Sequence, residues 1–179
     1  MAKRTPNTAL NEAADSLFGF PPIIDERARI LILGSFPSTA SLAAQQYYAH
    51  RQNQFWRMMS ALLDTPLVDR DYAARQQALR DAGIAVWDVY ASCERTGSLD
   101  SAIRGATLND FSRLRKHAPA LRRVCFNGQM AGRHERIFAG LGYATLVLPS
   151  TSPAYTLAFE KKLAAWRDAL LPEGGHQSN

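Results

Sequence analysis

Short apolar segments alternate along this chain with stretches in which hydrophobic residues recur at helical spacing. Four segments have the continuous apolar character of strands buried in a parallel sheet: Ile30 to Leu33, Ile84 to Val89, Arg122 to Phe126 and Tyr143 to Leu148. Helices are predicted over 54–63, 69 or 70 to 82, 99–104, 107–117, 129–141, and 156 or 158 to 171. The alternation predicts an α/β fold with three αβα layers and a central, mainly parallel four-stranded sheet.

The length and composition predict one domain. The chain has 179 residues, of which 46% are hydrophobic, so it can bury a core of its own. It contains no internal repeat and no linker-like stretch. We therefore expect residues 1–179 to form a single domain, with loose ends over 1–17 and 172–179.

Charge and cysteine content narrow the class of protein. A net charge of +5 and a pI of about 9.5 are compatible with a polyanionic partner without requiring one. Two cysteines, Cys93 and Cys125, are too few for a four-cysteine zinc or iron–sulfur site. With no secretory signal and no apolar run long enough to span a bilayer, we expect a reduced cytoplasmic protein without membrane or metal.

Polar and small residues follow each of the four predicted strands. Because the carboxyl ends of parallel strands lie at one edge of a sheet, these residues are expected to converge. They are Gly34 to Ser38, Asp88, Asn127, and Ser150 to Pro153. Ordinary structural roles fit each of them too: a helix cap for Asn127, a carboxylate bonded to backbone amides for Asp88, and a turn for the serines.

The segment from Gln46 to Trp56 carries many aromatic and amide side chains for a plain connection. It reads QYYAHRQNQFW and follows the loop after the first strand. Gly34, at the end of that strand, allows a tight turn and a close backbone approach. We therefore expect this segment to help form a pocket at the carboxyl edge of the sheet.

Taken together, these motifs resemble the uracil-DNA glycosylase superfamily, and within it the hypoxanthine-DNA glycosylase (DNA-deoxyinosine glycosylase) branch. The matching stretches are GSFPS at 34–38, QYYAH and NQFW within 46–56, WDV to GSLDSAI at 87–103, FNG at 126–128 and PSTSPA at 149–154. The resemblance covers residues 18–171 and is specific as a set. It implies a base-excision repair enzyme that removes deaminated bases from DNA, hypoxanthine first, without a cofactor.

Two departures from the wider superfamily bear on the chemistry. Many members carry Asp or Asn in the first motif, where it places the attacking water, but here Ser35 and Phe36 occupy that slot. In this branch the resemblance assigns the water to Asn53. Ser150 stands where the second motif often has His or Asn, which argues against uracil as the main substrate.

The roles expected of individual residues follow from glycosidic-bond cleavage of a flipped nucleotide. The amide of Asn53 cannot act as a general base and is expected to position water; it equally suits a helix cap. Base contacts are expected from Phe36, Phe55, Asp88 and Asn127, with Phe55 stacking and Asp88 accepting from N1–H. DNA-backbone contacts are expected from Ser38, Ser41, Arg51, Ser150 and Ser152, with Gly34 as the motif glycine. Further cations beside the motifs are Arg57, Arg95, Arg104 and Arg133.

No lysine lies in these motifs, so we expect a monofunctional, monomeric glycosylase that leaves an abasic site. Four alternatives stay open. They are a uracil or mismatch-specific DNA glycosylase, a nucleoside or nucleotide hydrolase, a cysteine enzyme built on Cys93 or Cys125, and a non-catalytic reader of damaged DNA.

Overall fold

A parallel four-stranded sheet forms the centre of the computed structural model, which describes residues 16–171. Its strands lie in the order β3 (Ile84–Asp88), β2 (Ile30–Gly34), β6 (Arg123–Asn127) and β7 (Ala144–Leu148). In the register, Gly34 pairs with Asp88 and Asn127 pairs with Leu148. The strands therefore end at nearly the same level, and the residues that follow them share one edge of the sheet.

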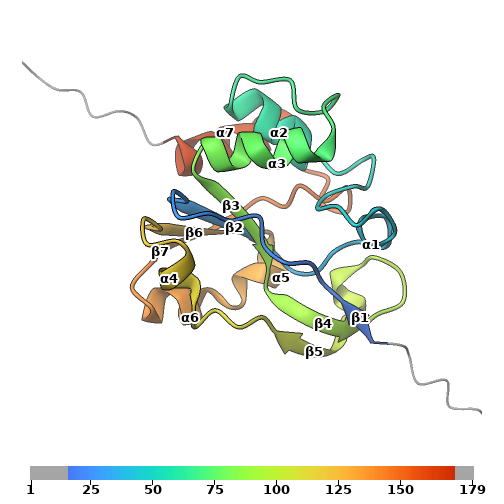
Figure 1. Cartoon of the computed structure of the whole chain (residues 1–179). Helices are drawn as coiled ribbons and strands as arrows, with labels where there is room; N and C mark the ends of the chain where they lie inside the picture. The colour runs from blue at the N-terminus through green and yellow to red at the C-terminus, as the bar shows by residue number, and fades with distance from the viewer. Residues whose placement is uncertain (1–15, 172–179) are drawn as a thin grey trace, which may run out of the picture.

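Helices cover both faces of this sheet (Figure 1). On one face α2 (Phe55–Leu62), α3 (Tyr72–Asp81) and α7 (Phe159–Leu170) pack over Ile32, Val86 and Cys125. On the other face α4 (Leu114–His117), α5 (Gln129–Gly132) and α6 (Glu135–Gly140) pack over Leu31, Leu33 and Phe126. The strand residues alternate between two cores, which confirms the predicted three-layer α/β fold.

The helices predicted at 54–63, 69–82 and 156–171 are confirmed by α2, α3 and α7. Apolar spacing buries Trp56, Met58 and Met59 on one side of α2. Gly83 follows α3 with a φ of +70°, a backbone conformation that glycine adopts without strain. The segment after β2 also forms a short helix, α1 (Thr39–Ala44), where a loop was predicted.

A second, antiparallel sheet was not predicted. It consists of β1 (Leu17–Phe18), β4 (Tyr90–Glu94) and β5 (Arg104–Leu108), in the order β1-β4-β5. The helix predicted over 107–117 is therefore wrong, and only α4 is helical there. Side chains compete with a helix at its start, because Asn109 Nδ2 donates to the Asp88 carbonyl (2.9 Å) and Asp110 Oδ1 accepts from the Ser112 amide (2.9 Å).

Three smaller differences complete the comparison with the sequence. The helix predicted over 129–141 is divided into α5 and α6 at His134, whose φ and ψ are −97° and 6°. The predicted helix at 99–104 is one 3-10 turn, Asp100–Ala102. The expected loose ends lie outside the described residues, except that Leu17 pairs with Cys93 in β1. Within residues 16–171, no helix has the length and apolar character that crossing a membrane requires.

Candidate active site

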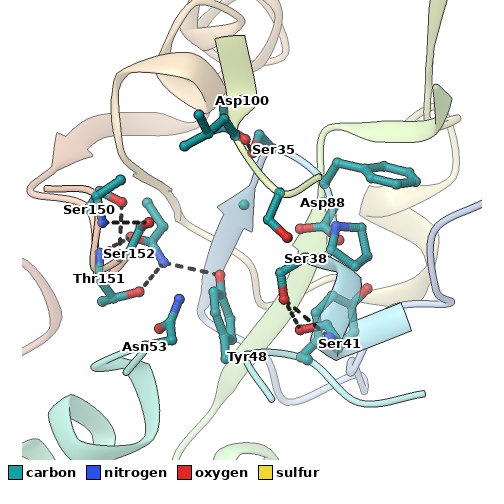
Figure 2. A pocket seen from close by; sticks show the side chains of 18 of the residues that line it. Ser35, Ser38, Ser41, Tyr48, Asn53, Asp88, Asp100, Ser150, Thr151 and Ser152 are labelled. Carbon is teal, nitrogen blue, oxygen red and sulfur yellow. Dashed lines mark hydrogen bonds between the residues drawn. The ribbon is translucent and has the colours of Figure 1, made fainter. Parts of the chain in front are cut away.

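A cavity of about 260 Å³ opens at the carboxyl edge of the parallel sheet. Figure 2 shows Asn53 and Tyr48 on one side of it, Ser150 to Ser152 on another, and Asp88 with Ser38 and Ser41 opposite. The ends of all four parallel strands contribute, as the sequence predicted. The expected residues in its wall are Gly34, Phe36, Ser38, Ser41, Asn53, Asp88, Asn127, Ser150 and Ser152.

Gly34 is required by its neighbours in the wall. A Cβ atom at this position would lie 2.4 Å from Asp88 Oδ1 and 3.3 Å from the hydroxyl oxygen of Tyr48. Real Cβ contacts are not that short, so any larger residue would displace the carboxyl group. The motif glycine thus lets an acid and a phenol approach the same point of the backbone.

Asp88 is a buried carboxyl group that lines the cavity. It is 4% exposed, and Oδ2 has no hydrogen-bond partner within the described part of the chain. Burial, with the charge of Asp100 adding to it and Arg95 opposing it, raises the pKa of Asp88 to about 8. The side chain is therefore mostly a neutral acid at pH 7, and one of its buried oxygens lacks the partner that such groups usually have. The predicted role of a carboxylate bonded to backbone amides does not account for it.

A second carboxyl group, Asp100, was not predicted as a site residue, although it lies in the GSLDSAI motif. Ser35 Oγ donates to Asp100 Oδ1 at 2.5 Å, which joins the loop after β4 to the loop after β2. Burial raises the pKa of Asp100, while the Ser35 hydrogen bond and Arg95 oppose this. The wall near Ser35 thus holds two acids whose ionisation is disfavoured.

Arg95, one of the cations beside the motifs, is buried. It is 8% exposed, lies 5.2 Å from the ring centre of Phe36, and donates to the carbonyl of Pro37. The guanidinium group contacts two residues of the first motif, Phe36 and Pro37, and does not line the cavity. This position removes Arg95 from the predicted phosphate contacts.

Tyr48 takes the aromatic position that was predicted for Phe55. Phe55 is fully buried and absent from the cavity wall, because the Tyr48 ring stacks on it with centroids 3.9 Å apart. Tyr48 adopts a φ of +55°, and its hydroxyl oxygen accepts from Asn127 Nδ2 at 3.2 Å. The prediction that Phe55 stacks on the base is thus corrected, and the Tyr48 ring stands between Phe55 and the cavity.

Asn127 joins two loops across the floor of the cavity. Its Nδ2 donates to Tyr48 and to Thr151 Oγ1 (2.9 Å), and its Oδ1 accepts from the Thr151 amide (2.9 Å). Both amide protons are used, so Asn127 orients its neighbours and has no amide proton left to donate to a base. Thr151 is completely buried and also accepts from the Gln54 amide through its carbonyl oxygen (2.9 Å).

Asn53 forms one local hydrogen bond through its side-chain oxygen and keeps its side-chain nitrogen free. Its Oδ1 accepts from the Phe55 amide at 2.9 Å, in the first turn of α2. Its Nδ2 has no hydrogen-bond partner within residues 16–171, and the side chain lines the cavity. Asn53 is thus not the N-cap of α2, which is Gln54, although its oxygen satisfies the first amide of that helix while its Nδ2 remains available.

The four predicted serines divide into two pairs. Ser38 caps α1 by accepting from the Ser41 amide (3.1 Å), and the buried Ser41 accepts from the Ala49 amide (3.1 Å). Ser150 and Ser152 also accept from amides, at 3.1 and 3.2 Å, which leaves their hydroxyl protons free to donate. Arg51 is exposed beside Gln52 and lies outside the cavity wall.

Among residues 16–171, no three His, Cys, Asp or Glu side chains are placed to hold a metal ion. Cys93 and Cys125 are free and buried. Burial raises the pKa of the Cys125 thiol to about 11, which disfavours the thiolate that a cysteine enzyme needs.

The parallel sheet carries acid, amide and hydroxyl groups on the loops at its carboxyl edge. This fold and site can be assigned to a known class of protein. The chain belongs to the uracil DNA glycosylase superfamily, whose sequence model matches residues 21–172. It is 42% identical over 148 residues to a hypoxanthine DNA glycosylase of Methanosarcina acetivorans, which covers 83% of this chain and 94% of the relative. A hypoxanthine DNA glycosylase of Methanosarcina barkeri is 39% identical over 151 residues, covering 84% and 96%.

A solved structure agrees with this assignment. The solution NMR structure of a Methanosarcina acetivorans protein, provisionally described as a uracil DNA glycosylase, matches with a TM-score of 0.80 at 40% identity. The match covers 87% of this chain and 97% of that one. The predicted family and fold are thereby confirmed.

Proposed function

We propose that this protein is a monofunctional DNA glycosylase that hydrolyses the N-glycosidic bond of deoxyinosine and releases hypoxanthine. One observation carries the substrate: a buried carboxyl group, Asp88, lines the cavity and has an oxygen without a protein partner among the described residues. A buried polar group without a partner favours a ligand that supplies one. Hypoxanthine presents N1–H as a donor beside the acceptor O6, and the names of the two relatives support the same substrate.

Base recognition is assigned to the Asp88 side of the cavity. One oxygen of the Asp88 carboxyl group accepts from N1–H, and the proton that this acid holds at neutral pH can be donated to O6. Phe36 and the Tyr48 ring supply the apolar surface against which the flipped base rests. Asn127 acts through Tyr48 and Thr151, since both of its amide protons are already used.

Asn53 is assigned to the attacking water. As the C1′–N9 bond breaks, the base leaves with the electron pair and the water oxygen bonds to C1′. Because the sugar develops positive charge, little proton removal from the water is needed before bond cleavage, and positioning suffices. The free amide of Asn53 and the second lone pair of its oxygen are the groups available to hold this water.

The DNA backbone is assigned to the hydroxyl groups at the rim. Ser150 and Ser152 keep free protons for phosphate oxygens, and Ser38 and Ser41 shape the facing loop. Exposed Arg51 lies beside the cavity and adds a cation for a neighbouring phosphate.

One assay tests the proposal. The purified protein is incubated, with EDTA present, with duplex and single-stranded oligonucleotides that carry deoxyinosine, deoxyuridine or deoxyxanthosine, and abasic sites are cleaved with alkali. We expect strand cleavage with deoxyinosine, and none without alkali. Release of uracil alone would favour the uracil-specific alternative, and loss of activity in EDTA would refute the metal-free mechanism. Binding without release of any base would favour a non-catalytic reader.

A further inference from the structure

A buried lysine, Lys162 in α7, forms a hydrogen bond with Tyr155, a residue of the cavity wall. It is 1% exposed, and its Nζ donates to the carbonyl oxygen of Tyr155 at 2.7 Å. The same ammonium group lies 5.3 Å from the centre of the Tyr155 ring. Tyr155 itself is 47% exposed and belongs to the cavity wall, so Lys162 connects a helix core to the rim of the site.

The contact is one of two that α7 makes with the loop from Pro149 to Tyr155. One turn further along the helix, Trp166 Nε1 donates to the Pro149 carbonyl at 2.9 Å. The middle of the loop is held from the other side, because Thr151 bonds to Asn127 and to the Gln54 amide. The other hydrogen bonds that the described structure forms in residues 152–155 are local turn contacts. The Tyr155 amide donates to the Ser152 carbonyl, the Ala154 amide to Ser152 Oγ, and the Ser152 amide to Ser150 Oγ.

Burying the ammonium group of Lys162 away from water costs free energy. A Met or Leu at this position would fill similar space without that cost, so packing alone does not explain a lysine. The only group that the described structure offers as a hydrogen-bond acceptor to Lys162 Nζ is the Tyr155 carbonyl. The side chain therefore serves the placement of this loop segment.

We infer that Lys162 is a positioning residue for DNA binding, which fixes residues 152–155 so that the Ser152 hydroxyl and the Tyr155 ring meet the DNA strand. The inference rests on the proposed function and adds a residue that the sequence motifs do not contain. Because Thr151, Asn53 and Asp88 are held independently of Lys162, its loss affects DNA affinity and leaves the chemical step at saturation nearly unchanged.

The test compares Lys162→Met with Lys161→Met, which removes the same charge from the exposed neighbouring position. Release of hypoxanthine is measured in single turnover over a range of enzyme concentrations, well below the unfolding temperature of each variant. For Lys162→Met we expect the half-saturating concentration to rise about tenfold and the maximal rate to stay within about threefold of wild type. For Lys161→Met we expect a change of less than about twofold in either value.

Amide hydrogen exchange supplies a readout that needs no activity. The amides of Ala154 and Tyr155 should exchange faster in Lys162→Met, while the amide of Thr151, held by Asn127, should not. If the wild type binds DNA but releases no base, the proposed function fails. Amide exchange and DNA affinity, measured on Lys162→Met, still test the positioning role of Lys162. Should Lys162→Met not fold, Lys162→Gln, whose side chain is one bond shorter, is measured in the same way.

Two outcomes would overturn the inference. One is a half-saturating concentration equal to that of Lys161→Met together with unchanged amide exchange, which would leave Lys162 a structural residue only. The other is a borohydride-trapped protein–DNA adduct in the wild type that Lys162→Met abolishes, which would make Lys162 a nucleophile.

Discussion

The neutral state of Asp88 predicts that replacing it by asparagine stabilises the protein. The pKa is raised in the folded state, so between about pH 4 and pH 8 the folded protein binds a proton that the unfolded chain has lost. In this range the contribution of Asp88 to stability falls as the pH rises. Asparagine has nearly the same shape but carries no charge at any pH, so the variant escapes this loss.

The magnitude follows from the two pKa values. The folded value of about 8 lies roughly four pH units above the ordinary value of 3.8, and each unit corresponds to about 1.4 kcal/mol. At pH 7 the penalty carried by the wild type is therefore up to about 4 kcal/mol, and Asp88→Asn should recover part of it. The gain should be small at pH 4 and should grow by up to about 1.4 kcal/mol per pH unit from pH 5 to pH 7.

Urea unfolding at pH 5, 6 and 7 measures this difference between the variant and the wild type. Asp69→Asn is the matched control, because it makes the same change at an exposed position that forms no side-chain hydrogen bond among the described residues. A stability difference for Asp88→Asn that is flat across this range would show that Asp88 is ionised when folded, and the reasoning on base recognition would lose its basis.

Three further predictions concern activity. Asn53→Ala should lose about 100-fold or more in single-turnover rate, equivalent to about 2.7 kcal/mol, with DNA binding kept. The lost hydrogen bond to the Phe55 amide should cost about 1 kcal/mol of stability. Near wild-type cleavage by the folded variant would remove the catalytic role. Gly34→Ala should abolish hypoxanthine release at a stability cost of about 1–3 kcal/mol, because the new Cβ would meet Asp88 Oδ1 at 2.4 Å; full activity would contradict the described packing. DNA affinity should fall steeply with salt, with a logarithmic slope of about 0.9 per phosphate contact, and a flat response in a titration by fluorescence anisotropy would contradict the backbone contacts.

The sequence allowed good prediction of features that depend on local pattern. The four parallel strands were recognisable because each is a continuous apolar run, and the residues at their ends followed from the shared direction of the strands. The same reasoning predicts that Gly34, Asp88 and Asn127 lie together, as they do in the cavity wall. In contrast, every residue of β5 is exposed, so its sequence carries no apolar alternation that would identify a strand.

The aromatic contact was harder to predict because it depends on a long-range arrangement. Tyr48 and Phe55 both lie in the QYYAHRQNQFW segment, and pattern alone does not say which ring faces the cavity. The choice depends on the positive φ of Tyr48 and on its bond to Asn127, which is 79 positions away in the sequence. Asp100 was missed for a similar reason, since its partner Ser35 lies 65 positions away.

The bridge that Asn127 forms between Tyr48 and Thr151 has a consequence for how DNA is searched. Because both loops are held together in the free protein, a nucleotide that enters finds the floor of the cavity already ordered. Little conformational entropy of the protein is then lost at each encounter with DNA. The free-energy difference by which the protein discriminates one nucleotide from another then arises mainly in the DNA, from the cost of unstacking and unpairing the base. Such an enzyme can leave well-paired nucleotides quickly. Its residence time is longer at bases that leave the helix easily.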